Sequence, residues 1–210
     1  GNHDFSNYHK KLRYEYKEEF WNKINNIPNI NLLNNETFKN DEIEFFGYRQ
    51  PWEYFINDKN QEDKEIMIND LKKLKKYLQE SEVPKIGLIH SPANITDQTI
   101  KEQLKNFDII LCGHMHNGCI PPLIDEIWKS DIGIISANKK LFSHNCRGKI
   151  VLHNEKNTNL IISGALTTFS KCSPKLFHPF NIFFPYYINQ IIITNDKNGE
   201  NKKRKYKYYK

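Results

Sequence analysis

Two apolar runs on either side of a helix-length segment constrain the fold of this 210-residue chain most strongly. The runs at 85–89 and 108–112 have the length and the apolar content of buried strands, and the segment 96–106 between them is predicted to be a helix. A strand, a helix and a second strand in about 30 residues form a βαβ unit, which requires parallel strands with the helix on one face. The chain is therefore predicted to have an α/β fold.

The rest of the chain supplies further helices and strands. Apolar residues recur every three or four positions over 8–26 and 63–80, which predicts two helices. The buried face of the second helix is expected to consist of Ile66, Leu71, Leu74 and Leu78. Strands are predicted at 30–33, 36–38, 43–48, 132–136, 149–151, 160–163 and 191–194. No repeat or linker is visible, so 1–195 is predicted to be one domain, with a basic, flexible tail over 196–210.

Composition argues against several classes of protein. No segment approaches the roughly 18 consecutive apolar residues of a membrane-spanning helix. The net charge is +6, but much of the excess lies in 202–210, so a solvated terminus is expected rather than a nucleic-acid-binding surface. The four cysteines show no Cys-x-x-Cys pairing, and they are expected to be reduced thiols.

Histidines follow both strands of the βαβ unit. His90 comes directly after the first apolar run, and His114 and His116 come shortly after the second. Ligands of open α/β sheets bind beyond the carboxyl ends of the strands, which is where these side chains are predicted to lie. Imidazole is a common ligand of transition metals, and the Asn2 amide oxygen suits harder divalent ions. Each residue alone is more often an ordinary polar side chain, so the prediction of a metal site depends on their order along the chain.

That order resembles the calcineurin-like metallophosphoesterase family. The family shows Gly-Asn-His-Asp, then a strand-end histidine, then Gly-His-x-His, and this chain has them at 1–4, at His90 and at 113–116. The loop 113–118 and the run 161–166 resemble more narrowly a bacterial phosphodiesterase-like branch of the family. The resemblance implies a four-layer α/β/β/α sandwich that hydrolyses phosphoester bonds. A phosphodiester is the expected substrate, and a phosphomonoester is the alternative.

The resemblance also implies two divalent metal ions, with Mn, Fe and Zn as the candidates. Asn2, His90 and His114 would bind the second ion, and His116 would bind the first. His3 would lie beside the scissile phosphate as the catalytic imidazole, and Asp4 would be the second catalytic residue because it orients His3.

The chain departs from the family pattern in one respect. The family's Asp-x-His and Gly-Asp-x-x-Asp motifs, which supply the carboxylate ligands, are not found, and Asp97, Asp108 and Asp131 stand in no context that would replace them. The chain is therefore expected to be truncated at its N-terminus, to lack most of one metal site and to be inactive alone. A membrane anchor could precede it, so a cytoplasmic and a membrane-associated bacterial protein are both compatible with the sequence. No specific protein partner is predicted.

Two other functions are compatible with the same residues. The chain could be a non-catalytic module that binds metal or phosphate on this fold. It could also be a hydrolase with a single zinc ion, although the His-Glu-x-x-His pattern that positions a general base is absent.

Overall fold

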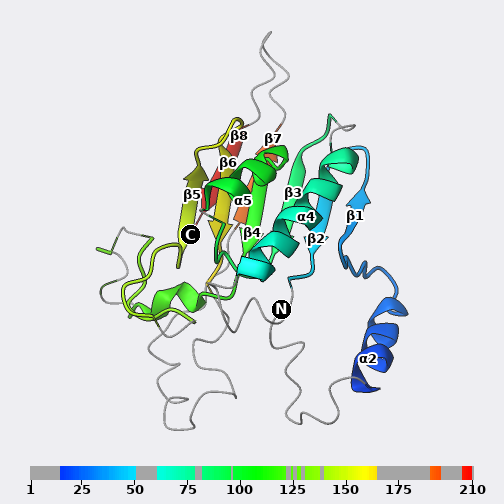
Figure 1. Cartoon of the computed structure of the whole chain (residues 1–210), viewed down its shortest axis with the longest axis horizontal. Helices are drawn as coiled ribbons and strands as arrows, with labels where there is room; N and C mark the ends of the chain where they lie inside the picture. The colour runs from blue at the N-terminus through cyan, green and yellow to red at the C-terminus, as the bar shows by residue number, and fades with distance from the viewer. Residues whose placement is uncertain are drawn as a thin grey trace. The chain divides into compact units, whose positions relative to one another are not determined.

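A mixed six-stranded sheet with the order β1-β2-β3-β4-β6-β5 forms the centre of the fold (Figure 1). In this computed structural model the described residues are 15–50, 61–78, 82–95, 97–121, 124, 127–128, 131–137, 140–164, 190–194 and 205–209. The strands are β1 (Glu36–Lys39), β2 (Glu44–Tyr48), β3 (Lys85–Ile89), β4 (Ile109–Cys112), β5 (Gly148–Leu152) and β6 (Thr158–Ile162). The helices are α2 (Glu15–Asn25), α4 (Gln61–Leu78) and α5 (Gln98–Gln103), with 3₁₀ turns η1 (Leu104–Asn106) and η2 (His116–Cys119). The predicted α/β class is confirmed.

Strands β2, β3 and β4 are parallel, whereas β1 pairs with β2 in the antiparallel sense. The predicted βαβ unit is confirmed as β3–α5–β4, and its register places Ile86 opposite Ile109. Parallel strands end at the same edge of a sheet. The residues that follow β2, β3 and β4 therefore lie along one edge, and this edge holds the candidate site.

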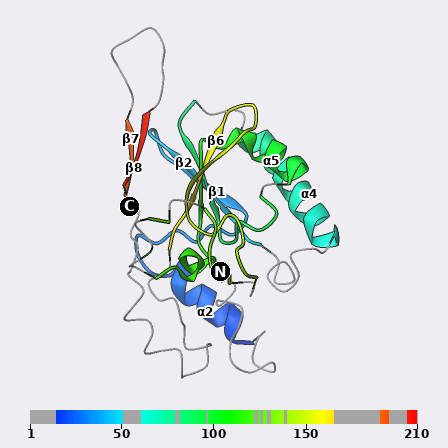
Figure 2. The same cartoon turned by 90° about the vertical axis from the view of Figure 1, so that its left-hand side faces the viewer.

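Helices α4 and α5 lie side by side on one face of the sheet (Figures 1 and 2). Helix α4 buries Met67, Leu71 and Leu74, whose i, i+4, i+7 spacing forms one apolar stripe. The predicted face is wrong at Ile66, which is 40% exposed, because Met67 takes the core position one residue later. Beneath the helices, the rings of Phe46 and Phe107 stack with centroids 6.1 Å apart.

Asp97 fixes the start of α5. Its carboxylate accepts hydrogen bonds from the backbone N–H groups of Thr99 and Ile100, as an N-cap does. The other carboxylate oxygen lies 2.7 Å from the Nζ of Lys64 on α4. The hydrogen bond from Lys64 is the main cause that lowers the pKa of Asp97. Asp97 thus joins the two helices. It also provides a hydrogen-bond acceptor for two N–H groups that have no partner within α5.

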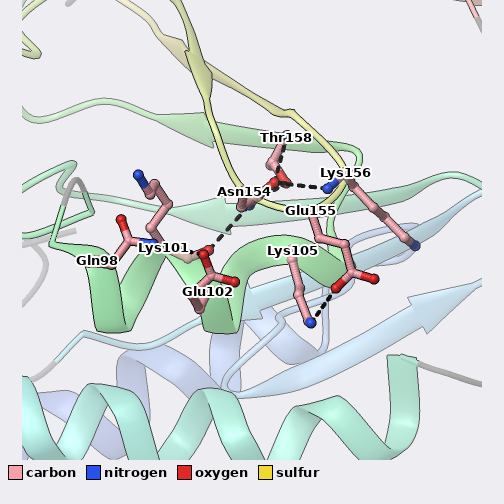
Figure 3. Close-up of polar contacts among 8 residues, drawn as sticks. All are labelled: Gln98, Lys101, Glu102, Lys105, Asn154, Glu155, Lys156 and Thr158. Carbon is pink, nitrogen blue, oxygen red and sulfur yellow. Dashed lines mark hydrogen bonds and ion pairs between the residues drawn. The ribbon is translucent and has the colours of Figure 1, made fainter.

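Asn154 and Thr158 fix the other end of this helical segment (Figure 3). The Asn154 Nδ2 donates to the backbone oxygen of Lys101 and to the Thr158 Oγ1, at 3.2 and 3.0 Å. Its Oδ1 accepts from the N–H groups of Lys156 and Thr158. The Thr158 hydroxyl in turn donates to the backbone oxygen of Phe107 at 2.8 Å. Every polar atom of the Asn154 side chain is therefore hydrogen-bonded, which suits a residue that is only 9% exposed.

Two predicted strands are wrong. Residues 30–33 are not a strand; they run close to β2, so that a Cβ on Gly47 would lie 2.4 Å from the Leu33 Cβ. Residues 132–136 contain only an isolated bridge between Ile135 and Leu141. The N–H groups of Ile134 and Ile135 both bond to the Gly118 oxygen instead of a neighbouring strand.

The chain separates into two compact units, one formed by 1–114 with 150–161 and the other by 115–149 with 162–210. In the second unit, β7 (Gln190–Thr194) pairs antiparallel with β8 (Lys205–Tyr209). The predicted flexible tail over 196–210 therefore ends in a paired strand. Parts of two predicted helices, 8–14 and 79–80, lie outside the described residues. In the part of the chain that is described, no helix has both the length and the apolar character to cross a bilayer.

Candidate functional site

His90 and His114 come together at the carboxyl edge of the parallel strands. His90 directly follows β3, and His114 lies two residues beyond the end of β4. Their imidazole rings meet edge to face, with centroids 5.1 Å apart and planes inclined by 65°. The N–H of Gly113 donates to the His90 backbone oxygen at 2.9 Å, which continues the pairing of the two strands up to the histidines.

A second contact holds the backbone beside His90 from the opposite direction. The Gln50 side chain, which is 2% exposed, accepts a hydrogen bond from the Ser91 N–H at 2.6 Å and donates to the Ser91 oxygen at 3.0 Å. The last paired residues of β2 and β3 are Tyr48 and Ile89, so Gln50 joins the two chains just beyond their strands. His90 is consequently flanked by backbone that is hydrogen-bonded on both sides.

The histidine pair fits a divalent transition metal. Two imidazoles on one tetrahedral ion, at the usual Zn–N distance of about 2.1 Å, have ring centroids roughly 5 Å apart. The observed separation of His90 and His114 is 5.1 Å, and both rings are partly accessible. Imidazole nitrogens suit Zn, Fe and Mn to different degrees, so the residue types of the pair do not select among these ions. Within the described residues, no group of three or more His, Cys, Asp or Glu side chains could hold a metal ion.

The loop that follows β4 has an unusual backbone. Four of its non-glycine residues have positive φ, namely His114 (65°), His116 (51°), Asn117 (55°) and Cys119 (51°). Gly118 joins them at 65°. A left-handed conformation costs a non-glycine residue roughly 1–3 kcal/mol, and such strain concentrates at functional sites. The loop therefore holds both histidines of the His-x-His pair in a conformation that the sequence alone does not favour.

Position 118 of this loop requires a glycine. A Cβ at Gly118 would lie 2.2 Å from the Gly133 Cα and 3.0 Å from the Cys146 Cβ, so the backbones meet directly. Gly113 differs, because a Cβ there would lie 3.8 Å from the nearest atom, the Nδ1 of His90. Of the two glycines in the motif, only Gly118 is required by close packing and by its φ angle.

Asn117 is a buried polar residue in the same loop. It is 7% exposed, and its Nδ2 has no hydrogen-bond partner among the described residues. An unpaired buried amide donor costs roughly 1–3 kcal/mol, so its presence next to His116 is a further sign of a functional loop.

The acidic residues named from the sequence have structural roles. Asp97 caps α5 and bonds to Lys64. The Asp108 Oδ2 accepts from the Lys85 N–H at 2.8 Å. The Asp131 Oδ2 accepts from the Asn145 N–H at 2.7 Å and lies 3.3 Å from the Nδ1 of His144. All three carboxylates therefore take part in contacts that hold the fold.

Three of the cysteines are described, and they are free thiols. Burial raises the pKa of Cys112 and of Cys119, and it raises the pKa of Cys146 to about 11. A raised pKa favours the protonated thiol over the thiolate that binds metal ions.

The remaining site predictions have different outcomes. His116 is the first residue of η2 and is partly buried. Asn2, His3 and Asp4 lie outside the described residues. Sequence reasoning missed Gln50, because it lies outside every predicted helix and strand. Its only signal was its position shortly after a predicted strand that would end at the same edge as His90.

Comparison with known protein families gives one match. The family profile described as calcineurin-like phosphoesterase matches residues 1–118. That match spans Asn2, His3, Asp4, the histidine pair and His116. A search of curated proteins and a search of solved structures each found no match.

Proposed function

The chain belongs to the calcineurin-like phosphoesterase family, and we propose that it serves the hydrolysis of phosphodiester bonds at a centre of two divalent metal ions. Membership of this family implies metal-dependent hydrolysis of phosphoesters in general. The observation that most supports a metal centre in this chain is the pair of His90 and His114, 5.1 Å apart at the ends of adjacent parallel strands.

The metal ligands in this proposal come from three segments. Asn2 would bind the second ion through its amide oxygen, together with His90 and His114, and His116 would bind the first ion. When bound, the ions supply Lewis-acid stabilisation of the charge that develops on the phosphoryl oxygens. Mn, Fe and Zn all accept this donor set.

The protein groups next to the phosphate would be His3 and Asp4. The His3 imidazole would donate a hydrogen bond or a proton to the leaving oxygen of the ester. Asp4 would accept a hydrogen bond from the other ring nitrogen and so fix the tautomer of His3. The loop 113–118 supports the narrower assignment to a bacterial phosphodiesterase-like branch. We also propose that 1–195 acts as one catalytic domain.

Metal stoichiometry tests the proposed ligands. The family's Asp-x-His and Gly-Asp-x-x-Asp carboxylates are not among the 210 residues, so we expect this chain to retain one ion and to hydrolyse little by itself. Metal analysis after dialysis against Mn²⁺ or Zn²⁺ measures the bound equivalents. Two tightly bound equivalents would contradict the proposed ligand set.

Hydrolysis of bis-p-nitrophenyl phosphate with added Mn²⁺ tests the activity, in a chain extended by the family's Asp-x-His and Gly-Asp-x-x-Asp motifs. The His3→Ala variant should bind metal as the parent does but lose most of the turnover, since an acid or base in the transition state contributes roughly 10²–10⁴-fold. Turnover that equals the His3→Ala background would favour the non-catalytic binding module.

A further inference from the structure

We infer that Gln50 is a positioning residue for the candidate metal site: its side chain fixes the backbone next to His90 and thereby the orientation of the His90 imidazole. This inference rests on the proposed function, because it treats His90 as a metal ligand. The Gln50 amide acts through its two hydrogen bonds to Ser91, the residue that follows His90.

The geometry of the contact supports this role. Both polar atoms of the Gln50 amide bond to one residue, at 2.6 Å from the Ser91 N–H and 3.0 Å to the Ser91 oxygen. The pair is buried, with Gln50 2% exposed and Ser91 1% exposed, so water does not compete for either bond. A glutamine side chain in this arrangement substitutes for the next rung of the β2–β3 ladder, which ends at Tyr48 and Ile89.

The position of the contact points to His90 rather than to general stability. Ser91 directly follows His90, and on its other side His90 accepts from the Gly113 N–H at 2.9 Å. A rotation of the His90 backbone toward or away from His114 would have to break one of these bonds. Residues that orient metal ligands in this way typically change metal affinity by roughly 10- to 100-fold when they are replaced.

Asn154 provides a matched control. It is also a buried amide that bonds to backbone atoms, among them the Lys101 oxygen, and it lies among the residues of the α5 and β5–β6 region shown in Figure 3. Replacement of Asn154 should lower stability without any effect on the histidine pair. A purely structural role for Gln50 would make the two replacements alike.

The experiment compares Gln50→Met with Asn154→Ala in the full chain. Methionine keeps the volume and removes both hydrogen bonds. We expect Gln50→Met to weaken the nuclear Overhauser contact between the ring protons of His90 and His114, and to lower the Zn²⁺ affinity measured by titration calorimetry roughly 10- to 100-fold. Asn154→Ala should leave the ring contact and the Zn²⁺ affinity unchanged and lower only the unfolding midpoint.

The outcomes separate this inference from the proposed function. If Gln50→Met keeps both the ring contact and the wild-type Zn²⁺ affinity, the positioning role is overturned. If Zn²⁺ binding by the parent chain does not depend on His90, the proposed ligand set fails, and the ring contact in the metal-free protein still decides the role of Gln50. Should Gln50→Met not fold, Gln50→Glu takes its place: it keeps the acceptor for the Ser91 N–H and loses the donor. A ring contact in Gln50→Glu equal to that of the parent would overturn the role as well.

Discussion

Two buried asparagines in two loops show how differently this chain treats the same side chain. Asn154, between β5 and β6, uses its Nδ2 and its Oδ1 in hydrogen bonds, and so closes the end of the α5 segment. Asn117, in the loop after β4, is 7% exposed, and its Nδ2 is unpaired among the described residues. The asparagine of the first loop therefore has all of its polar atoms hydrogen-bonded. The asparagine of the second loop has an amide donor without a partner in the described part of the chain, next to His116 in the sequence.

The backbones of the two loops differ in the same sense. Between Gly113 and Cys119, four non-glycine residues have positive φ, whereas Asn157 is the one such residue in the loop 153–157. Strain and an unpaired donor both reduce stability, and a stable fold tolerates them where function requires a fixed geometry. The comparison therefore supports the functional role proposed for the loop after β4 and a stabilising role for the β5–β6 loop.

Gly118→Ala should have the largest effect on this comparison. The new Cβ would lie 2.2 Å from the Gly133 Cα, at a φ of 65°, so neither loop backbone can yield easily. We expect a loss of about 3 kcal/mol or more in the free energy of unfolding, measured by urea titration. Gly148→Ala is the control, because Gly148 has a φ of 77° but no atom within 4 Å of the added Cβ. It should cost only about 1 kcal/mol. Equal losses in the two variants would mean that the close approach to Gly133 does not matter.

Substitution of the two asparagines by glycine tests the comparison itself. Asn154→Gly removes the partners of the Lys101 oxygen and of the Lys156 and Thr158 N–H groups, and it should cost about 2–3 kcal/mol. Asn117→Gly removes an unpaired donor and relieves a φ of 55°, so it should cost less than about 1 kcal/mol. Urea titration of both variants measures the difference. The reverse ranking would show that the loop after β4 is the one that stabilises the fold.

Asp97→Ala tests the opposite end of the helix that Asn154 stabilises. Asp97 caps the start of α5, whereas Asn154 bonds near its end. Loss of the cap should cost about 1 kcal/mol at pH 7. The hydrogen bond from Lys64 lowers the pKa of Asp97 below its unfolded value. The stabilisation is therefore complete above a pH of about 4 and fades as the pH falls through the lowered folded-state pKa. Thermal unfolding between pH 2 and pH 7 should show the two proteins converging in acid; a constant difference would contradict the assigned ion pair.

Gly113→Ala should have the smallest effect. A Cβ at Gly113 would lie 3.8 Å from the His90 Nδ1, an ordinary contact distance. We expect a change within about 0.5 kcal/mol in the free energy of unfolding. A loss as large as that of Gly118→Ala would show that the loop after β4 is crowded along its whole length, not only at Gly118.

The sequence predicted the parts of the fold that depend on local apolar patterns. The runs at 85–89 and 108–112 contain β3 and β4 because residues 86–89 and 109–112 are apolar, as buried parallel strands are. Residues 132–136 have similar residue types, but the N–H groups of Ile134 and Ile135 bond to the Gly118 oxygen. No local pattern reveals which partner a strand-like segment will find.

The candidate site was predictable to a similar degree. His90 and His114 were recognised because both follow predicted parallel strands, and the structure brings their rings together. Gln50 was not, because a glutamine in a polar loop becomes informative only when Ser91 is seen opposite to it. Roles that depend on contacts between distant segments thus require the fold.

The central claim is that His90 and His114 bind the same metal ion, and a double-mutant cycle in Zn²⁺ affinity tests it most directly. Titration calorimetry would compare the parent chain with His90→Ala, His114→Ala and the double variant, with His144→Ala as a control that is paired with Asp131 outside the proposed site. A shared ion predicts that each single change weakens binding strongly and that the double variant is little weaker than either single variant. Affinities that match the parent in both single variants, or losses that simply add in the double variant, would contradict a metal ion held between these two histidines.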